Sequence, residues 1–325
     1  MKPAPALPLA RPRGAATNSG RAQPQLALAL AFALALAQPP AAGAAPAPSA
    51  RSVAYDSRSF VLDGARTFVT SGSIHYQRVL PADWPRALQL AKEAGFNAVQ
   101  TYVLWDQHEP ERDNVSFSGQ NDISAFVALA GSLGLIVDVR VGPYICGEHF
   151  NGGIPVWMRE EGAACFRCSD AAWEAFTVHV LSAVVGELRR SQSLWTQGGP
   201  VYLLQVENEY GGRDLDYLKF CVAAARNETT DVPWLLCHDE DLCAAVNAGG
   251  PPEGLALCTI NGFWEDSSAE GDQQPSPAFV AAQRKQNPGQ PLAWTEDQGW
   301  FDQVRCPICS PPSFPPLPAP PSPPN

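Results

Sequence analysis

The sequence has no apolar stretch of 18 or more residues, so we expect no membrane-spanning segment. Charged residues make up only 17% of the chain, and 33 acidic against 22 basic residues give a net charge of −11. A chain with this charge repels phosphate backbones, which argues against nucleic-acid binding. The hydrophobic content of 45% is enough to fill a large core, which excludes a disordered chain as a whole.

Proline is concentrated at the two ends of the chain. Nine of the 32 prolines lie in residues 1–50 and ten in residues 306–325, which leaves 13 for the 255 residues between. That share is ordinary for a globular domain, and the length is typical of an eight-stranded barrel. We therefore expect a leader with a small-residue linker over 1–50, a globular domain over 51–305 and a disordered proline-rich tail over 306–325.

The leader contains a 12-residue apolar run, LALALAFALALA, at residues 26–37. This run is too short to cross a bilayer but has the length of a signal-peptide core, and the small residues 41–50 after it offer a cleavage site. We expect secretion, to the cell wall or to a vacuole- or lysosome-like compartment. The alternative is an organelle transit peptide, because the basic leader is long and rich in Ala and Pro. Glycosylation triplets at Asn114 and Asn227 fit a secretory route.

Nine cysteines leave room for disulfides in an oxidising compartment. The pair Cys165 and Cys168 forms a C-x-x-C pattern, for which metal binding or redox cycling is the alternative to a disulfide. No second C-x-x-C with zinc-like spacing and helix context accompanies it, so we expect no metal site. The candidates for pairing in the globular segment are Cys165, Cys168, Cys221, Cys237, Cys243 and Cys258.

Strand-like and helical patterns alternate through the middle of the chain. The expected strands are 68–74, 97–103, 135–141, 201–206, 233–237, 255–260 and 291–295. The expected helices are 84–93, 122–133, 171–188, 215–225 and 276–285, with Asp122 and Asp214 as N-caps. Such alternation implies parallel strands joined by right-handed crossovers, so we expect an α/β fold of the (β/α)₈ TIM-barrel type with seven strands by residue 295.

Acidic residues follow three of these strands, where the active sites of barrels lie. Glu148 follows the third strand, Glu207 and Glu209 follow the fourth, and Glu296 follows the seventh. For any one of these carboxylates alone, a structural role, in which it caps a helix or pairs with an arginine, explains its position as well as a functional role does. Several carboxylates on one rim, interleaved with Trp and Tyr, indicate a sugar site, because flat aromatic rings stack on sugar C–H faces and carboxylates bind hydroxyls.

Residues 198–210, GGPVYLLQVENEY, resemble the signature of glycoside hydrolase family 35, the β-galactosidases. The resemblance covers residues 52 to about 304, and residues 233–263 are closer to plant-type or algal members than to animal ones. Further matching motifs are SGSIHY (71–76), NAVQTYV (97–103), HEP (108–110), GPYIC (142–146) and GGIP (152–155).

The resemblance implies catalytic glutamates at the ends of strands four and seven. The acid/base maps onto Glu209 and the nucleophile onto Glu296. The implied reaction is retaining hydrolysis of terminal β-D-galactose, with the two carboxyls about 5 Å apart and no metal or organic cofactor. The alternatives are an exo-acting enzyme for another β-linked sugar, or a non-catalytic or misfolded fragment that at most binds carbohydrate.

The resemblance also assigns the substrate contacts. It maps contacts with sugar hydroxyls onto Tyr102, Glu148 and Asn208, and the wall of the galactose pocket onto Cys146. Asn208 is expected to bind the 2-hydroxyl, a contact that strengthens in the transition state.

The sequence departs from the family pattern in three places. Where the family usually has Ala-Glu-Trp, this chain has GEH at residues 147–149, which removes an aromatic wall and makes His149 a rim residue. The run DQGW at 297–300 is one residue shorter than in many members, so the neighbouring subsite is altered or is a subgroup variant. The family continues with an eighth strand and β-sandwich domains, so we expect a barrel cut before closure, with the proline tail replacing the familiar continuation.

Overall fold

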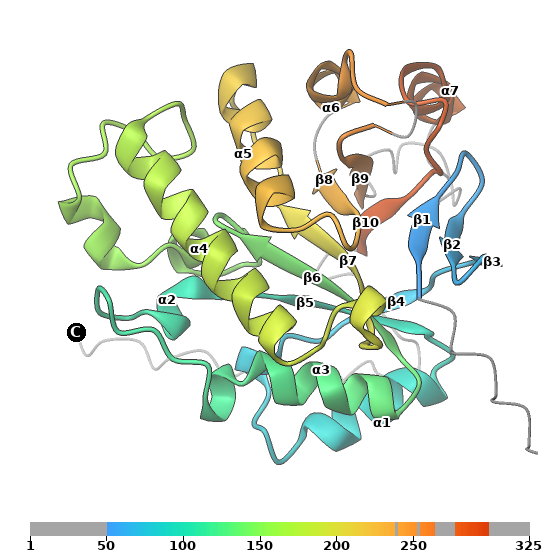
Figure 1. Ribbon diagram of the computed structural model, residues 1–325, viewed down its shortest axis with the longest axis horizontal. Coiled ribbons are helices and arrows are strands. Elements are labelled where there is room, and N and C mark those ends of the chain that lie inside the picture. The colour runs from blue at the N-terminus through green and yellow to red at the C-terminus, as the bar shows by residue number, and fades with distance from the viewer. Residues whose placement is uncertain (1–50, 238–239, 252–253, 264–276, 299–325) are drawn as a thin grey trace, which may run out of the picture. The chain divides into compact units, whose positions relative to one another are not determined.

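The computed structural model describes residues 51–237, 240–251, 254–263 and 277–298 (Figure 1). The predicted leader over 1–50 and the predicted disordered tail over 306–325 lie outside the described residues, so they stay predictions. No helix among the described residues combines the length and the apolar character that crossing a membrane requires.

A parallel sheet forms the centre of the fold. Its strand order is β10-β9-β8-β7-β6-β5-β4, so each strand pairs with its neighbours in the chain, and every pairing is parallel. All seven predicted strands are confirmed, and the curled sheet is that of a partial (β/α)₈ barrel. The strands are β4 (Ser71–Ser73), β5 (Ala98–Tyr102), β6 (Ile136–Gly142), β7 (Val201–Val206), β8 (Trp234–Cys237), β9 (Leu257–Phe263) and β10 (Trp294–Gln298).

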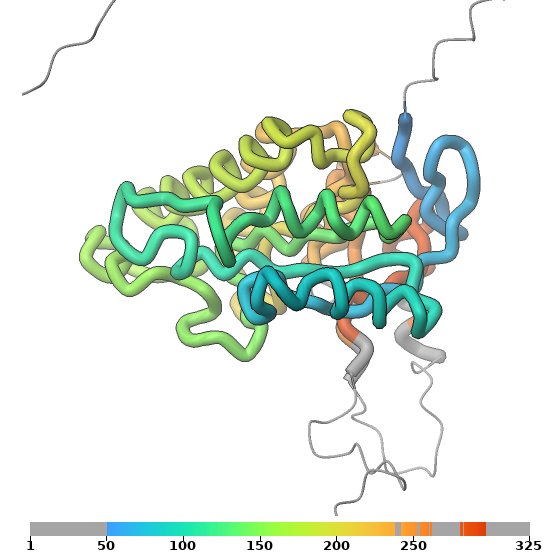
Figure 2. The backbone as a smooth tube through the Cα atoms, turned by 90° about the horizontal axis from the view of Figure 1, so that it is seen from below, coloured from blue at the N-terminus to red at the C-terminus, as the bar shows by residue number. Residues whose placement is uncertain are grey.

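Helices follow the strands and cover the outside of the sheet. In chain order they contact one another as α1–α3, α3–α4, α4–α5, α5–α6 and α6–α7, and Figure 2 shows α1 beside α3. Five were predicted, and the short α2 and α6 were not. The helices are α1 (Trp84–Glu93), α2 (Trp105–His108), α3 (Ile123–Ser132), α4 (Ala171–Arg190), α5 (Leu215–Glu228), α6 (Glu240–Asn247) and α7 (Pro277–Gln286). Short 3₁₀-helices are η1 (Tyr76–Arg78), η2 (Gly119–Asn121), η3 (Phe150–Gly153), η4 (Val156–Glu160) and η5 (Trp195–Gln197).

Helix starts follow the expected capping chemistry. The Asp122 carboxylate accepts a hydrogen bond from the Ala125 amide, and the Asp214 carboxylate accepts one from the Tyr217 amide. Asp170 caps α4 in the same way. Each cap satisfies an amide that the first turn leaves without a partner, so the predicted caps at Asp122 and Asp214 are confirmed.

A small antiparallel sheet precedes the barrel and was not predicted. It is formed by β1 (Val53–Tyr55), β2 (Phe60–Leu62) and β3 (Ala65–Thr67). Phe60 packs edge-to-face on Tyr202 of β7, with ring centroids 5.2 Å apart, which attaches this sheet to the barrel. Strands of three residues are too short to show alternation in sequence.

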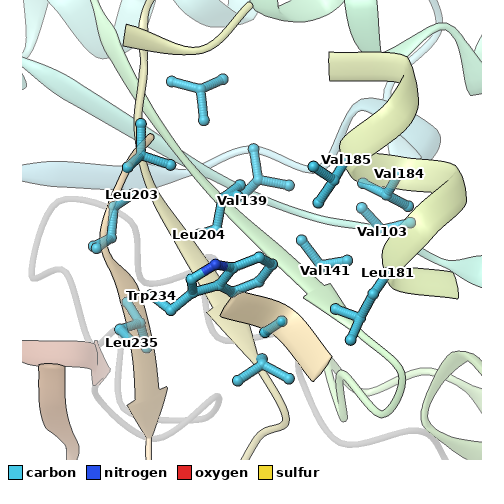
Figure 3. Packing of buried hydrophobic residues seen from close by; sticks show 14 of the residues in the cluster. Val103, Val139, Val141, Leu181, Val184, Val185, Leu203, Leu204, Trp234 and Leu235 are labelled. Atoms are coloured by element: carbon cyan, nitrogen blue, oxygen red, sulfur yellow. The ribbon is translucent and has the colours of Figure 1, made fainter. Parts of the chain in front are cut away.

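The main core lies between the parallel sheet and its helices. Every residue of β5, β7 and β8 is buried, as expected of strands covered on both faces. Figure 3 shows Leu181 and Val184 of α4 beside Val141 of β6, with Trp234 of β8 in the same cluster. Full burial of each such side chain contributes about 1.5–3 kcal/mol to the stability of the fold. The close packing of this layer gives the strand ends a rigid support.

Two disulfides form among the described cysteines. They join Cys165 to Cys168 and Cys243 to Cys258. The C-x-x-C pair is therefore a disulfide. Of the other candidates for pairing, Cys221 and Cys237 are free and buried.

Candidate active site

The chain makes a tight turn directly after β7. Glu207 and Glu209 have φ values of 60° and 44°, in the left-handed region that side chains other than glycine seldom adopt. Backbone hydrogen bonds hold the turn on both sides: the Glu207 amide donates to Gly142 O over 3.0 Å, and the Glu209 amide donates to Cys237 O over 3.1 Å. The turn is thus fixed between the carboxyl ends of β6 and β8, which supports the strained backbone.

Glu207 is the internal anchor of this turn. It is fully buried and accepts hydrogen bonds from the Arg167 guanidinium at 3.1 and 2.6 Å and from the Tyr217 hydroxyl at 2.6 Å. It also accepts a hydrogen bond from the backbone N–H of Asn208 at 2.9 Å. Since its carboxylate oxygens are occupied by these donors, Glu207 orients the turn and is not a free acid or base.

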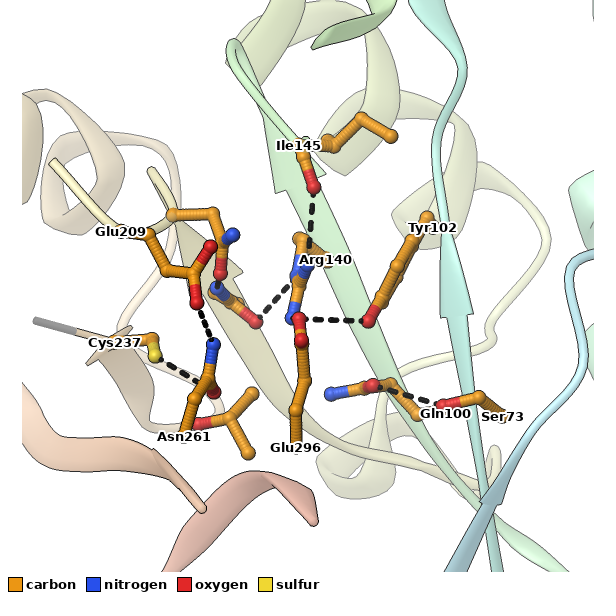
Figure 4. Close-up of polar contacts among 12 residues, drawn as sticks. Ser73, Gln100, Tyr102, Arg140, Ile145, Glu209, Cys237, Asn261 and Glu296 are labelled. Carbon is orange, nitrogen blue, oxygen red and sulfur yellow. Dashed lines mark hydrogen bonds and ion pairs between the residues drawn. The ribbon is translucent and has the colours of Figure 1, made fainter. Parts of the chain in front are cut away.

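Glu209 and Glu296 are both neighbours of Asn261 on β9. The Asn261 Nδ2 donates a hydrogen bond to Glu209 Oε1, and the register of β9 with β10 places Asn261 beside Glu296. Residues in register on parallel strands point to the same face, so both carboxyl groups lie on one face at the barrel end. Figure 4 shows Glu209, Asn261 and Glu296 in this arrangement.

Asn261 is itself held by Cys237. The Cys237 thiol donates to Asn261 Oδ1 over 3.1 Å, which fixes the amide so that its nitrogen faces Glu209. Burial raises the pKa of the Cys237 thiol to about 12, so this donor keeps its proton across the physiological range.

Glu296 accepts hydrogen bonds from two side chains. The Tyr102 hydroxyl donates to its Oε1 over 3.1 Å, and Arg140 Nη2 donates to the same oxygen over 2.5 Å. Arg140 is fully buried and lies 3.8 Å from the centroid of the Tyr102 ring. Burial raises the pKa of Tyr102 well above its ordinary value, so the phenol remains a donor. The guanidinium compensates the charge of the carboxylate.

Arg140 connects Glu296 with Asn208 through Gln205. Its Nε donates to Gln205 Oε1 over 2.9 Å, and Gln205 Nε2 donates to Asn208 Oδ1 over 3.1 Å. Asn208 is fully buried, and its Nδ2 has no hydrogen-bond partner among the described residues. A buried donor without an acceptor costs free energy, so this nitrogen is a group that a bound ligand can satisfy.

A second polar layer lies beneath the site. Gln100 Nε2 donates to Asp138 over 3.0 Å, and Figure 4 shows Gln100 beside Ser73. Burial raises the pKa of Asp138 to about 6. His75 stacks on Tyr102 with ring centroids 4.0 Å apart, and burial together with nearby arginines lowers the pKa of His75 to about 3, so the imidazole is neutral at physiological pH.

The loop after β6 carries the remaining predicted residues. Cys146 is a free, half-buried thiol, and Glu148 is exposed. His149 is half-buried and bonded to Asp106 over 2.8 Å. Of the predicted set, the structure groups Glu209, Glu296, Tyr102 and Asn208 with Arg140, and it places Glu148 on the surface of this loop.

Three site residues were not assigned a role from the sequence: Arg140, Gln205 and Asn261. Arg140 and Gln205 are polar residues in buried, mostly apolar strands, which is a signal that could have found them because such residues are costly to bury without a purpose. Asn261 was noted only as part of a motif. Within the described ranges, no three His, Cys, Asp or Glu side chains gather in a way that could hold a metal ion.

Comparison with known proteins places the fold in the barrel class. The structure is similar to an exo-β-1,4-mannosidase from Opitutaceae bacterium strain TAV5, with a TM-score of 0.55 and 16% identity, over 74% of this chain and 46% of that one. At this identity the likeness concerns the fold alone.

The sequence comparisons identify the family. Residues 59–310 match the family described as Glycosyl hydrolases family 35, and the chain belongs to it. β-Galactosidase 8 of Arabidopsis thaliana is 34% identical over 78% of this chain, and β-galactosidase 6 of Oryza sativa subsp. japonica is 34% identical over the same share. The chain spans 28% and 27% of the lengths of these relatives.

Proposed function

We propose that this protein is a retaining β-galactosidase that removes terminal non-reducing β-D-galactose from oligosaccharides or glycans. Membership in the family and the β-galactosidases among its relatives support the reaction class. The observation that carries the assignment of the catalytic pair is the shared neighbour of the two glutamates: Asn261 bonds to Glu209 and lies in register with Glu296.

Glu296 is the proposed nucleophile. Its contacts with Tyr102 and Arg140 both fall on Oε1, so Oε2 is the oxygen that we assign to attack on the anomeric carbon. The Arg140 guanidinium forms an ion pair with the carboxylate that makes this attack, so the two opposite charges attract each other. The same two donors hold the carboxylate in one orientation, which lowers the entropy lost on reaching the transition state.

Glu209 is the proposed acid/base. Because an amide N–H donates to its Oε1, the proton of the neutral acid belongs on Oε2, the oxygen that would protonate the leaving group. As the glycosidic bond breaks, Glu209 loses this proton and becomes a carboxylate. It then takes a proton from the water that hydrolyses the galactosyl–Glu296 ester, which returns both groups to their starting states.

Asn208 is the proposed contact for the sugar 2-hydroxyl. Its buried Nδ2 lacks an acceptor among the described residues, and a hydroxyl oxygen would supply one. Gln205 fixes the amide orientation by donating to Oδ1. We assign Tyr102 to a sugar-hydroxyl contact, Cys146 to the pocket wall, and the exposed Glu148 to a hydroxyl contact at its mouth.

We also propose that the chain enters the secretory pathway. The exposed Cys165 is in a disulfide, and disulfides persist in oxidising compartments. Sequencing of the N-terminus of the mature protein tests this: cleavage between residues 41 and 50 supports it, and an intact leader contradicts it.

The hydrolysis assay uses the full chain with chromogenic β-D-galactoside, β-D-glucoside and β-D-mannoside. We expect the galactoside to be hydrolysed with the highest kcat/KM, and proton NMR to detect β-galactose before mutarotation. A folded protein that binds galactose without turnover would contradict the proposal and favour a non-catalytic carbohydrate-binding protein. A preference for another sugar would reassign the substrate.

A further inference from the structure

Arg167 holds the turn that carries Asn208 and Glu209, and it comes from the long connection between β6 and β7. It lies between η4 and α4 and makes a two-pronged ion pair with Glu207, through Nε at 3.1 Å and Nη2 at 2.6 Å. The same Nη2 donates to the Asn208 carbonyl over 2.5 Å. One guanidinium therefore contacts both the side chain and the backbone of the turn.

The guanidinium is also packed by aromatic rings. It lies 3.8 Å from the centroid of the Tyr144 ring and 5.4 Å from that of Tyr210. Its partner Glu207 is fully buried, and a buried carboxylate that loses its cation is strongly destabilised. The position of Arg167 is therefore tied to the conformation of residues 207–209.

The backbone at Arg167 is held by a covalent ring. The Cys165–Cys168 disulfide encloses Arg167, whose φ of 56° is unusual for a residue other than glycine. A disulfide between residues three apart restricts the unfolded chain less than one that closes a longer loop, so its main consequence is local. Phe166, inside the same ring, stacks on Trp173 of α4 with centroids 5.3 Å apart, which fixes the ring to the helix layer.

We propose that Arg167 is a positioning residue for Asn208 and Glu209, and that the Cys165–Cys168 disulfide holds it in place. The proposal rests on the function proposed above. In the disulfide form, the closed loop presents the guanidinium to Glu207 and to the Asn208 carbonyl. When the disulfide is opened, the loop gains backbone freedom, the ion pair is populated less, and the Asn208 amide and the Glu209 carboxyl lose their fixed geometry.

The chemistry of opening needs only a small dithiol reductant such as dithiothreitol. Its two thiols transfer two electrons and two protons: the S–S bond breaks, Cys165 and Cys168 become thiols, and the reductant becomes a cyclic disulfide. The structure makes this selective, because Cys165 is exposed and Cys168 half-buried, whereas Cys243 and Cys258 are both buried. Mild reduction is expected to open the first disulfide before the second.

The first test measures kcat and KM of the full chain on a β-galactoside and on its 2-deoxy analogue. Dithiothreitol, Cys165→Ser/Cys168→Ser and Arg167→Met are each expected to lower kcat on the galactoside about tenfold or more, with a smaller change in KM. The loss on the 2-deoxy substrate is expected to be smaller, because that substrate cannot use the Asn208 contact. Arg167→Lys keeps the charge but cannot make the bidentate contact, and it is expected to have a higher kcat than Arg167→Met.

Two control variants isolate the disulfide. Cys165→Ser/Cys168→Ser is expected to be insensitive to dithiothreitol, whereas Cys243→Ser/Cys258→Ser is expected to keep the sensitivity of the wild type. Equal losses on the two substrates would overturn the positioning of Asn208, whose contact only the galactoside can use. Unchanged kcat in Arg167→Met would overturn the positioning role as a whole.

Hydrogen–deuterium exchange separates this inference from the proposed function. Opening the disulfide is expected to speed amide exchange in the peptide containing residues 207–210, relative to peptides of β5. If the wild type hydrolyses no galactoside, the proposed function fails, and the exchange experiment still decides the inference. Unchanged exchange in 207–210 after confirmed reduction would overturn it.

Discussion

Arg140 and Glu296 form an ion pair between β6 and β10, with Arg140 Nη2 2.5 Å from Glu296 Oε1. The guanidinium also donates to Gln205, which donates in turn to Asn208. The proposed nucleophile and the proposed 2-hydroxyl contact are thus joined through three strands of the sheet. A displacement of Arg140 affects both ends of the site, so it is the residue whose removal tests the network.

Removal of Arg140 is expected to damage both stability and activity. Arg140→Met leaves the Glu296 carboxylate without its cation and Gln205 without a donor, so we expect about 3 kcal/mol less free energy of unfolding and at least about 100-fold lower kcat. Arg140→Lys keeps the charge and is expected to be intermediate. Urea denaturation and steady-state kinetics measure the two effects. An Arg140→Met protein with unchanged kcat contradicts the assigned role.

The two glutamates are expected to separate by their response to the leaving group. Glu296→Gln should lose turnover on every substrate, because the attacking carboxylate is gone. Glu209→Gln should keep the glycosylation step on a dinitrophenyl galactoside, whose leaving group needs no protonation, and lose it on an alkyl galactoside. Pre-steady-state release of the phenol measures this step. Equal loss of the glycosylation step in both variants would contradict the assigned roles.

Asn261 is expected to set the orientation of Glu209. Asn261→Ala removes the donor to Glu209 Oε1, and we expect about tenfold lower kcat with little change in the free energy of unfolding. Asn261→Asp places a second carboxyl group beside Glu209 and is expected to lower kcat further than Asn261→Ala does, because neighbouring carboxylates repel each other. The matched control is Cys237→Ser, which keeps a hydroxyl donor to Asn261 and should retain most activity. Full activity in Asn261→Ala would be inconsistent with this arrangement.

Asp138 is expected to make stability depend on pH. Its pKa is about 6 in the folded protein against an ordinary 3.8, so the folded state binds the proton more tightly than the unfolded state. The free energy of unfolding therefore falls as pH rises from about 3.8 to about 6, by roughly 3 kcal/mol in total. Asp138→Asn lacks this titration and is expected to be more stable than wild type at pH 8, but not at pH 4. Urea denaturation at both pH values checks the difference, and a difference independent of pH argues against it.

The fold could be predicted from sequence where a strand or helix has a clear hydrophobic pattern of its own. The bounds of β7 and α1 agree with the predicted 201–206 and 84–93, because an apolar run and an amphipathic period are local properties. The three-residue strands β1–β3 escaped prediction, since their pairing depends on a neighbour and not on their own pattern. The helix α6 was missed because it is only eight residues long.

The site could be predicted only in part. The strand ends and the family resemblance indicated Glu209 and Glu296, but their shared neighbour Asn261 depends on the register of β9 and β10. The link from Arg140 to Glu296 depends on which strands face each other across the curled sheet. The resemblance assigned the acid/base to Glu209 and not to Glu207, and the partners Arg167 and Tyr217 add the physical reason, since they make Glu207 a buried anchor.

If Glu296 attacks galactose from the position in which Arg140 and Tyr102 hold its carboxylate, the glycosyl group must become bonded to Glu296. The direct measurement is mass spectrometry of the peptide containing Glu296 after incubation of the full chain with a 2-deoxy-2-fluoro-β-galactosyl fluoride, which forms the glycosyl–enzyme faster than it is hydrolysed. We expect one fluorogalactosyl group on Glu296 in the wild type and none in Glu296→Gln. A label on another carboxylate, or an unlabelled protein that still hydrolyses β-galactosides, would contradict it.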